Sequence, residues 1–213
     1  MKVATIAVGP LQENCHLVVD EATSEAALID PGAEDERLLA AVQGSGARLA
    51  AIWLTHAHFD HVGAVGALRR ATGAPIHLHP ADAPLYARAA DSALVYGLDV
   101  EQPPPADVAL ADGDVLALGA LRFDVWHAPG HAPGHVVLVG HGAAFVGDCL
   151  FAGSVGRTDL PLADPRQLAA TLERLATLPP ETVVYPGHGP TTTIGAELAS
   201  NPFLNGSIRL VRG

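Results

Sequence analysis

The amino-acid sequence predicts an α/β fold in which two sheets pack together and helices cover their outer faces. Short apolar runs of strand length alternate with stretches of helical spacing, and the strands cluster separately in each half of the chain. The 213 residues are 49% apolar and 16% charged, which supplies ample aliphatic material for a core and excludes a disordered chain. We therefore expect a single domain over residues 1–213.

The first half opens with a meander of three strands, because three β-rich runs are separated only by polar turns. A helix follows the first Pro-Gly turn, since Leu38, Leu39 and Val42 recur at helical spacing. The expected strands span 3–8, 16–19, 26–29, 51–54 and 76–78, and the expected helices span 34–42, 62–71 and 81–90.

The second half follows Pro103-Pro104-Pro105, a run that is too short for a domain linker and predicts a rigid loop. Strand-length apolar runs then recur, and one helical stretch precedes the last of them. The expected strands span 115–118, 121–126, 136–139, 143–146 and 182–185, and the expected helices span 165–178 and 192–199.

Charge and composition exclude several classes of protein. With 23 acidic and 12 basic residues the formal charge is −11, which disfavours nucleic acid and anionic membranes as partners. No apolar run approaches the roughly 20 residues that cross a bilayer, and the run after Lys2 is too short for a secretory signal. Two cysteines cannot form a disulfide scaffold, so we expect a cytoplasmic protein in which Cys149 is a small buried apolar residue.

Histidine is unusually frequent, with 11 copies, and four metal-competent side chains gather in one segment. Residues 55–61 read Thr-His-Ala-His-Phe-Asp-His, between an expected buried strand and a helix, in a loop that can turn several side chains toward one point. His56 and His58 project the same way if strand geometry persists. For this segment alone, a chance cluster of surface histidines is the alternative.

Three later residues of ligand type also follow expected strands. His131 lies in a Pro-Gly-His segment, Asp148 directly follows a glycine, and His188 lies in Pro-Gly-His-Gly. Each of them alone is compatible with a loop residue that bonds to the backbone. All four segments together favour a metal centre.

These segments, taken in order, resemble the metallo-β-lactamase superfamily, and the match spans about residues 3–204. The resemblance implies a four-layer αβ/βα sandwich with two mixed sheets, helices outside and two metals at one edge. It implies that the first metal is held by His56, His58 and His131, that the second is held by Asp60, His61 and His188, and that Asp148 bridges both.

Imidazole and carboxylate ligands suit divalent zinc, iron or manganese, and we expect zinc with iron or manganese as alternatives. Water on such a metal can have a pKa near 7, which yields hydroxide at neutral pH. Two divalent metals, two carboxylates and one bridging hydroxide leave a charge of about +1, which favours an anionic substrate or an oxyanion. Asp60 and Asp148 are accordingly the expected catalytic carboxylates.

Two further residues have weaker signals. Asp30, in Ile-Asp-Pro-Gly, resembles the superfamily's aspartate that orients a histidine ligand, and an ordinary Asp-Pro turn is the alternative. Arg157, in Gly-Arg-Thr-Asp, is a candidate to clamp a substrate carboxylate. A structural ion pair of Arg157 with Asp159 or Asp164 is the competing interpretation.

Within the superfamily, the chain is most similar to the short bacterial hydroxyacylglutathione hydrolase-like proteins, the glyoxalase II group. Gly-Asp-Cys-Leu-Phe at 147–151, Gly-Arg-Thr-Asp-Leu-Pro at 156–161 and Asn-Pro-Phe-Leu at 201–204 carry this similarity. Full-length glyoxalase II enzymes add a helical segment whose basic residues hold glutathione, whereas here only Arg209 and Arg212 are basic after the last expected ligand. The thiol partner therefore stays open.

This resemblance implies a monomer or small homo-oligomer that hydrolyses small anionic thioesters of the S-lactoylglutathione type through a metal-bridging hydroxide. One alternative is a persulfide dioxygenase with a single iron on His56, His131 and Asp148. Another is a non-catalytic, metal-stabilised binding module. A β-lactamase and a nuclease are disfavoured by the missing signal peptide and by the acidic charge.

Overall fold

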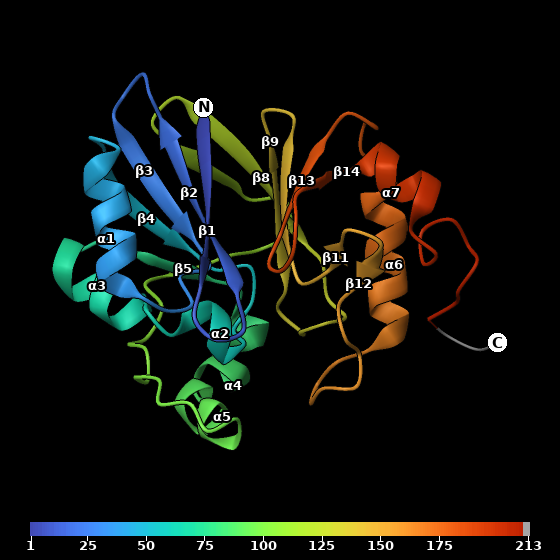
Figure 1. The fold of residues 1–213 in the computed structure, drawn as a ribbon, viewed down its shortest axis with the longest axis horizontal. Helices are drawn as coiled ribbons and strands as arrows, with labels where there is room; N and C mark the ends of the chain where they lie inside the picture. The colour runs from blue at the N-terminus through green and yellow to red at the C-terminus, as the bar shows by residue number, and fades with distance from the viewer. Residues whose placement is uncertain (211–213) are drawn as a thin grey trace.

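The computed structural model describes residues 1–210, which form two six-stranded sheets packed face to face (Figure 1). The first sheet has the order β1-β2-β3-β4-β5-β6, antiparallel from β1 to β3 and parallel from β3 to β6. Its strands are β1 (Lys2–Val8), β2 (Glu13–Asp20), β3 (Glu25–Ile29), β4 (Arg48–Trp53), β5 (Ile76–Leu78) and β6 (Val108–Ala109).

The second sheet has the order β14-β13-β10-β9-β8-β7 and is also mixed, because β10 and β13 are parallel while the other pairs are antiparallel. Its strands are β7 (Val115–Leu118), β8 (Leu121–His127), β9 (Val136–Gly140), β10 (Ala143–Gly147), β13 (Val183–Pro186) and β14 (Thr192–Thr193). A separate hairpin joins β11 (Leu150–Phe151) to β12 (Ser154–Val155).

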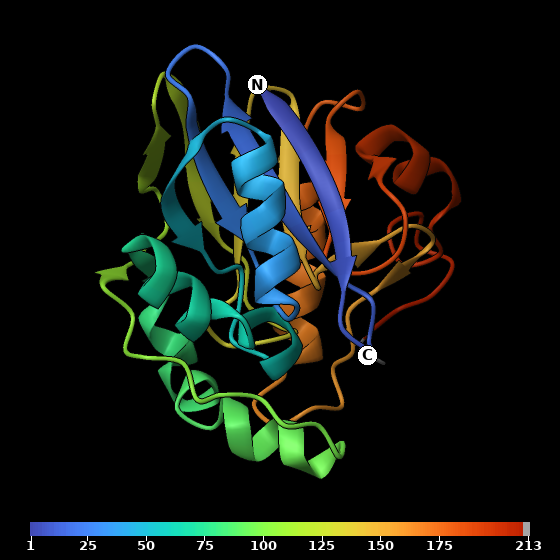
Figure 2. The same ribbon diagram turned by 60° about the vertical axis from the view of Figure 1, so that its left-hand side comes forward.

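Helices cover the outer face of each sheet, so the fold has four layers and confirms the predicted class. Figure 2 shows α1 lying across the first sheet, and Figure 1 shows α6 and α7 on the far side of the second. The helices over the first sheet are α1 (Asp35–Gly44) and α3 (Val65–Thr72), and those over the second are α6 (Pro165–Leu175) and α7 (Ile194–Ser200). The short helices α2 (Phe59–Val62), α4 (Ala83–Tyr86) and α5 (Ala89–Val95) lie below the end of the first sheet and pack in the same apolar cluster as α1 and α3.

The core lies in three apolar layers, which the alternation of strand side chains explains. In β2, Leu17 and Val19 pack in the cluster under the helices, whereas Val18 between them packs in the cluster between the sheets. In that central layer the rings of Trp53 and Phe123 meet edge to face, with centroids 5.5 Å apart. Both faces of the first sheet are therefore buried. This packing holds the ends of the strands, which carry the site, in defined positions.

The helix predicted over 62–71 is divided into α2 and α3 at Gly63 and Ala64. A Cβ on Gly63 would lie 2.3 Å from the Gly32 carbonyl oxygen, and the Ala64 amide donates to the Pro31 carbonyl. The break thus lets the backbone dock against the end of β3. Helical spacing alone does not reveal such a contact with a distant segment.

Other departures from the predicted elements are small. The helix predicted over 81–90 is divided into a 3₁₀ turn at Pro80–Asp82, α4 and the start of α5, and α6 ends at Leu175 rather than 178. The two-residue strands β6, β11, β12 and β14 were not predicted, because two residues are too few to show a period.

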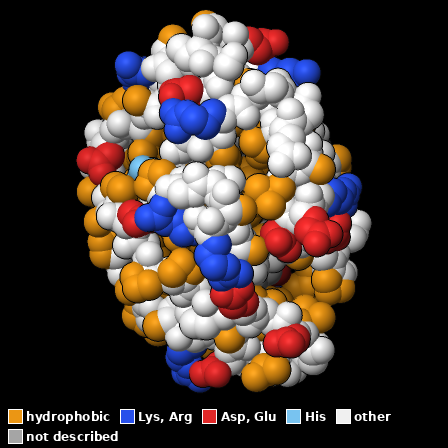
Figure 3. Space-filling model, turned by 90° about the vertical axis from the view of Figure 1, so that its left-hand side faces the viewer, with side chains coloured by type: hydrophobic (Ala, Val, Ile, Leu, Met, Phe, Trp, Pro, Cys, Tyr) orange, Lys and Arg blue, Asp and Glu red, His pale blue; other side chains and the backbone are white. Residues whose placement is uncertain are grey.

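The face that carries α1 and α3 shows basic side chains beside acidic ones (Figure 3). Its exposed pairs join Arg37 to Glu34 at 2.8 Å and Arg69 to Asp107 at 2.9 Å. Exposed pairs of this kind contribute at most about 1 kcal/mol to stability. Within residues 1–210, no helix has the length and apolarity needed to span a membrane.

Candidate metal centre

The predicted ligands converge at one edge of the sandwich, beside α2 in Figure 1. The loops after β4, β8, β10 and β13 and the short helix α2 supply them, so segments more than a hundred residues apart in sequence meet there. Three groups of three side chains in the described residues could hold an ion: Asp30 with His56 and His61, and two trios that consist only of predicted ligands. The first trio is His56, His58 and His131, and the second trio is Asp60, His61 and His188.

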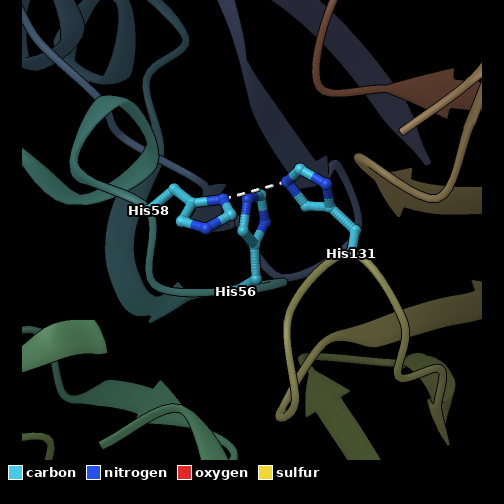
Figure 4. A group of neighbouring side chains, drawn as sticks. All are labelled: His56, His58 and His131. Carbon is cyan, nitrogen blue, oxygen red and sulfur yellow. Dashed lines mark hydrogen bonds between the residues drawn. The ribbon is translucent and has the colours of Figure 1, made fainter. Parts of the chain in front are cut away.

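In the first trio, one ring nitrogen from each histidine lies within 4.8 Å of the others. His58 Nδ1 and His131 Nε2 are 2.9 Å apart, and the His56 ring lies between them and below (Figure 4). Burial lowers the pKa of His58 to about 3 and that of His56 well below its usual value, and the neighbouring imidazoles add to both shifts. These histidines are therefore neutral, which is the form that binds metals.

The second trio combines a carboxylate with two imidazoles. Asp60 Oδ2 lies 3.3 Å from His188 Nε2 and 3.8 Å from His61 Nε2. Burial opposes a charge on His61, but Asp148 and Asp60 outweigh it and raise the pKa of His61 above its usual value. This position thus carries negative charge that favours a cation.

Asp148 lies between the two trios. Its Oδ1 is 3.5 Å from His61 Nε2, and its Oδ2 is 3.5 Å from His131 Nε2 and 3.8 Å from His188 Nε2. Burial opposes ionisation of Asp148, but His61 and His131 hold the pKa of its carboxyl well below the usual value. The structure therefore brings all seven predicted ligands together around an ionised carboxylate.

Hydrogen bonds orient the rings from behind. His61 Nδ1 donates to Asp30 Oδ2 at 3.2 Å, and His131 Nδ1 donates to the Arg157 carbonyl at 2.9 Å. The Thr55 hydroxyl donates to Asp30 at 2.5 Å and lies 3.1 Å from His56 Nδ1. In each of these three histidines the remaining nitrogen, Nε2, points toward the other predicted ligands, as metal-binding imidazoles require.

The donor atoms fit two divalent metals. His56 Nε2, His61 Nε2 and Asp148 Oδ1 are buried without a hydrogen-bond partner, a costly arrangement that a bound cation would relieve. Gly187 also keeps the backbone close, because a Cβ there would lie 2.3 Å from Asp148 Oδ1. Imidazole and carboxylate donors suit zinc, iron or manganese.

Comparison with known proteins decides the family. The sequence profile of the metallo-beta-lactamase superfamily matches residues 8–188. The chain belongs to the metallo-β-lactamase superfamily. The family and the fold predicted from the four ligand segments are thereby confirmed, and the chain is a member of a metallo-hydrolase superfamily.

Full-length relatives of this superfamily member are similar over almost their whole chains. Hydroxyacylglutathione hydrolase GloC of Haemophilus influenzae is 38% identical, over 96% of this chain and 99% of that protein. The crystal structure of TTHA1623 in a di-iron-bound form is 51% identical with a TM-score of 0.89, covering 95% and 100% of the two chains. The crystal structure of ETHE1 from Myxococcus xanthus is 32% identical with a TM-score of 0.83, covering 98% and 87%.

Three buried polar residues of this metallo-β-lactamase-superfamily protein escaped the sequence analysis. Glu13 lies behind the second trio with Oε1 3.7 Å from His61 Nδ1, both of its oxygens lack a hydrogen-bond partner, and burial raises its pKa. The side-chain amide of Asn14 donates to the backbone carbonyls of Pro186 and Gly189, on either side of His188. The third is Asp82, in the 3₁₀ turn. No motif in the sequence singles out any of the three.

Arg157 is exposed and forms a two-point ion pair with Asp159, with both N–O distances at 2.9 Å. The structure thus shows the ion pair with Asp159, which was the competing interpretation of Arg157 from the sequence. Cys149 is buried as expected, and its sulfur lies 3.3 Å from His135 Nδ1. Of the two basic residues near the C-terminus, Arg212 lies outside the described residues.

Proposed function

We propose that this protein is a metal-dependent hydrolase that cleaves thioesters of the S-lactoylglutathione type. The observation that carries the proposal is the position of Asp148, whose two carboxylate oxygens face different trios. Such a bridging carboxylate is the arrangement expected of a two-metal hydrolase. The relative named hydroxyacylglutathione hydrolase, at 38% identity, supports the substrate class.

The first trio would hold one metal and the second trio the other, with Asp148 shared. When bound, the two ions would lower the pKa of a water to about 7 and polarise the thioester carbonyl. Zinc remains our expectation, and the relative solved in a di-iron-bound form supports iron as the alternative.

The exposure of the ligand side chains indicates the side from which substrate would approach. His56 and His61 are fully buried, whereas the side chains of His188 and Asp60 are 27% and 16% exposed. Substrate would therefore reach the centre over Asp60 and His188. Behind them, Asp30 and the Arg157 carbonyl keep the His61 and His131 rings aimed inward, so little reorganisation is needed during reaction.

Substrate charge would be recognised by Arg157. Its partner Asp159 is also exposed, and such surface pairs contribute at most about 1 kcal/mol. Arg157 can exchange Asp159 for a substrate carboxylate at little cost. A thiolate leaves readily, so the mechanism needs no dedicated acid.

We also infer that the protein acts in the cytoplasm as one domain. Cys15 and Cys149 are both buried and unpaired, as in proteins of a reducing compartment.

A persulfide dioxygenase is the second candidate. His56, His131 and Asp148 are two histidines and one carboxylate, which is the ligand set of a mononuclear iron site. The second trio favours hydrolysis over this alternative, because an oxygenase with a single metal would not need the three ligands of the second trio.

The test is the reaction itself, run without oxygen on zinc-loaded protein. We expect cleavage of S-lactoylglutathione or a related thioester with release of free thiol. Strict dependence on iron and oxygen, with sulfite formed from a persulfide, would establish the dioxygenase instead. Absence of both reactions with two metals bound would favour a binding module.

A further inference from the structure

Asp82 is a fully buried carboxylate beside the first trio that lies outside the predicted ligand set. Its Oδ2 accepts a hydrogen bond from the amide of Ala57 at 2.8 Å, and its Oδ1 accepts one from the amide of Gly134. Ala57 stands between His56 and His58, and Gly134 follows His131 by three residues. One carboxylate therefore joins the two loops that supply the whole first trio.

The two loops come from different sheets, one after β4 and the other after β8. Asp82 fits closely between them, because a Cβ on Gly134 would lie 2.9 Å from both Cβ and Cγ of Asp82. The Asp82 amide donates to the His79 carbonyl at 3.0 Å, which fixes the carboxylate from its own backbone. Three hydrogen bonds, with Ala57, Gly134 and His79, thus fix the position of Asp82.

A buried carboxylate costs free energy, and the two backbone amides offset part of that cost. Burial raises the pKa of Asp82 to about 6, against the lowering effect of the Gly134 and Ala57 amides, so the group is ionised at neutral pH. Charge-assisted bonds to two amides are stronger than neutral ones and restrain both loops.

We propose that Asp82 is a positioning residue that sets the separation of the two loops so that His56, His58 and His131 converge on one metal. This inference rests on the ligand assignment of the proposed function. Asp82 acts mainly on the first trio, because the second has supports of its own: Asp30 bonds His61, and Asn14 bonds the loop of His188.

The test variant is Asp82→Asn, which keeps the shape but turns an NH₂ group toward one of the backbone amides. Asp20→Asn is the matched control. Asp20 is also buried, and its carboxylate likewise joins two segments, accepting from the amides of Ala22 at 3.0 Å and Ala120 at 2.7 Å. It lies at the opposite end of β2 from the metal centre.

Zn²⁺ is titrated into metal-free protein against a competing chelator, while the ring ¹⁵N signals of the histidines report which trio fills. In Asp82→Asn we expect the Zn²⁺ affinity of the first trio to fall about 10–100-fold, and that of the second to fall by a smaller factor. Asp20→Asn should bind both ions as the wild type does. Wild-type affinity at the first trio, an equal fall at both trios, or an equal fall in Asp20→Asn would overturn the proposal.

A second measurement needs no variant. In metal-free wild-type protein the amide hydrogens of Ala57 and Gly134 should remain protected from exchange, because the carboxylate and not the metal holds them. Loss of that protection on metal removal would refute the proposal even if Asp82→Asn does not fold. Wild-type protein that binds two Zn²⁺ but cleaves no thioester would refute the proposed function and leave this inference standing.

Discussion

The two trios of the metal centre differ in charge and in exposure. The first consists of three imidazoles kept neutral by burial, whereas the second includes the carboxylate of Asp60. In the first trio only His58 is partly exposed, whereas in the second both Asp60 and His188 are, with side chains 16% and 27% exposed. The second trio is thus more anionic and opens to solvent on one side.

This difference indicates different tasks for the two positions. A cation on three neutral ligands would keep more of its charge and be the stronger Lewis acid, while one beside Asp60 would be more neutralised and would stand on the side from which we propose that substrate approaches. Asp148 couples the two, since each of its oxygens faces a different trio.

The largest effect should come from Asp148→Ala, which removes the group common to both trios. We expect loss of at least one metal and a fall in thioester turnover of about 1,000-fold or more, the scale of losing transition-state charge stabilisation. Metal content and turnover are measured on the same sample. Retention of both metals with near-normal turnover would refute the bridging role.

Burial as the cause of neutral imidazoles can be tested at His16, a buried histidine outside both trios. Burial lowers the pKa of His16 to about 4, although its bond to the Pro186 carbonyl opposes the shift. Between pH 6.5 and pH 4 the unfolded chain binds a proton at His16 that the folded protein does not bind, so this group by itself should lower the free energy of unfolding by about 3 kcal/mol. Chemical denaturation of metal-free protein measures this slope.

The matching variant His16→Phe removes the titrating group. Its unfolding free energy should depend less steeply on pH over the same range. An unchanged slope would assign the pH dependence to other groups.

Recognition of substrate charge can be tested with Arg157→Met. Binding of anionic thioesters in the transition state should weaken by about 1.5–3 kcal/mol, the value of a charge-assisted hydrogen bond, while neutral thioesters are nearly unaffected. The values of kcat/KM for a matched pair of substrates give the comparison. Arg37→Met is the control, since Arg37 is also exposed and paired, with Glu34. An equal loss for both substrates would return Arg157 to a structural role.

The smallest effect is expected from Asp30→Asn, which weakens the support of His61 without removing a ligand. Zn²⁺ affinity at the second trio should fall about 10–100-fold. The first trio should weaken as well, because Thr55 donates to Asp30 and lies 3.1 Å from His56 Nδ1, but the second trio should lose more affinity here than in Asp82→Asn. Competition with a chelator, followed by the ring signals of the histidines, measures the Zn²⁺ affinity of each trio separately. If Asp30→Asn and Asp82→Asn lowered the two affinities in the same ratio, the trios would not be supported separately.

Local sequence patterns predicted most strands of the two sheets and the four segments that carry the ligands, and the resemblance to the superfamily assigned the individual ligands. Apolar runs such as 51–54 ended at the residues that form the site, and glycine or proline beside His131, Asp148 and His188 marked the turns. The residues that hold the ligands were not predictable in this way. Asp82 bonds a residue 52 positions away and Asn14 one 175 positions away, so their roles exist only after the sheets have packed.

The most direct test of the two-trio centre is the number of metal ions per chain in fully active protein. Elemental analysis should be combined with thioester turnover during stepwise removal of metal by a chelator. The arrangement of Asp148 between the trios predicts two ions per chain, with turnover lost as soon as either position empties. Full turnover with a single ion per chain would contradict it.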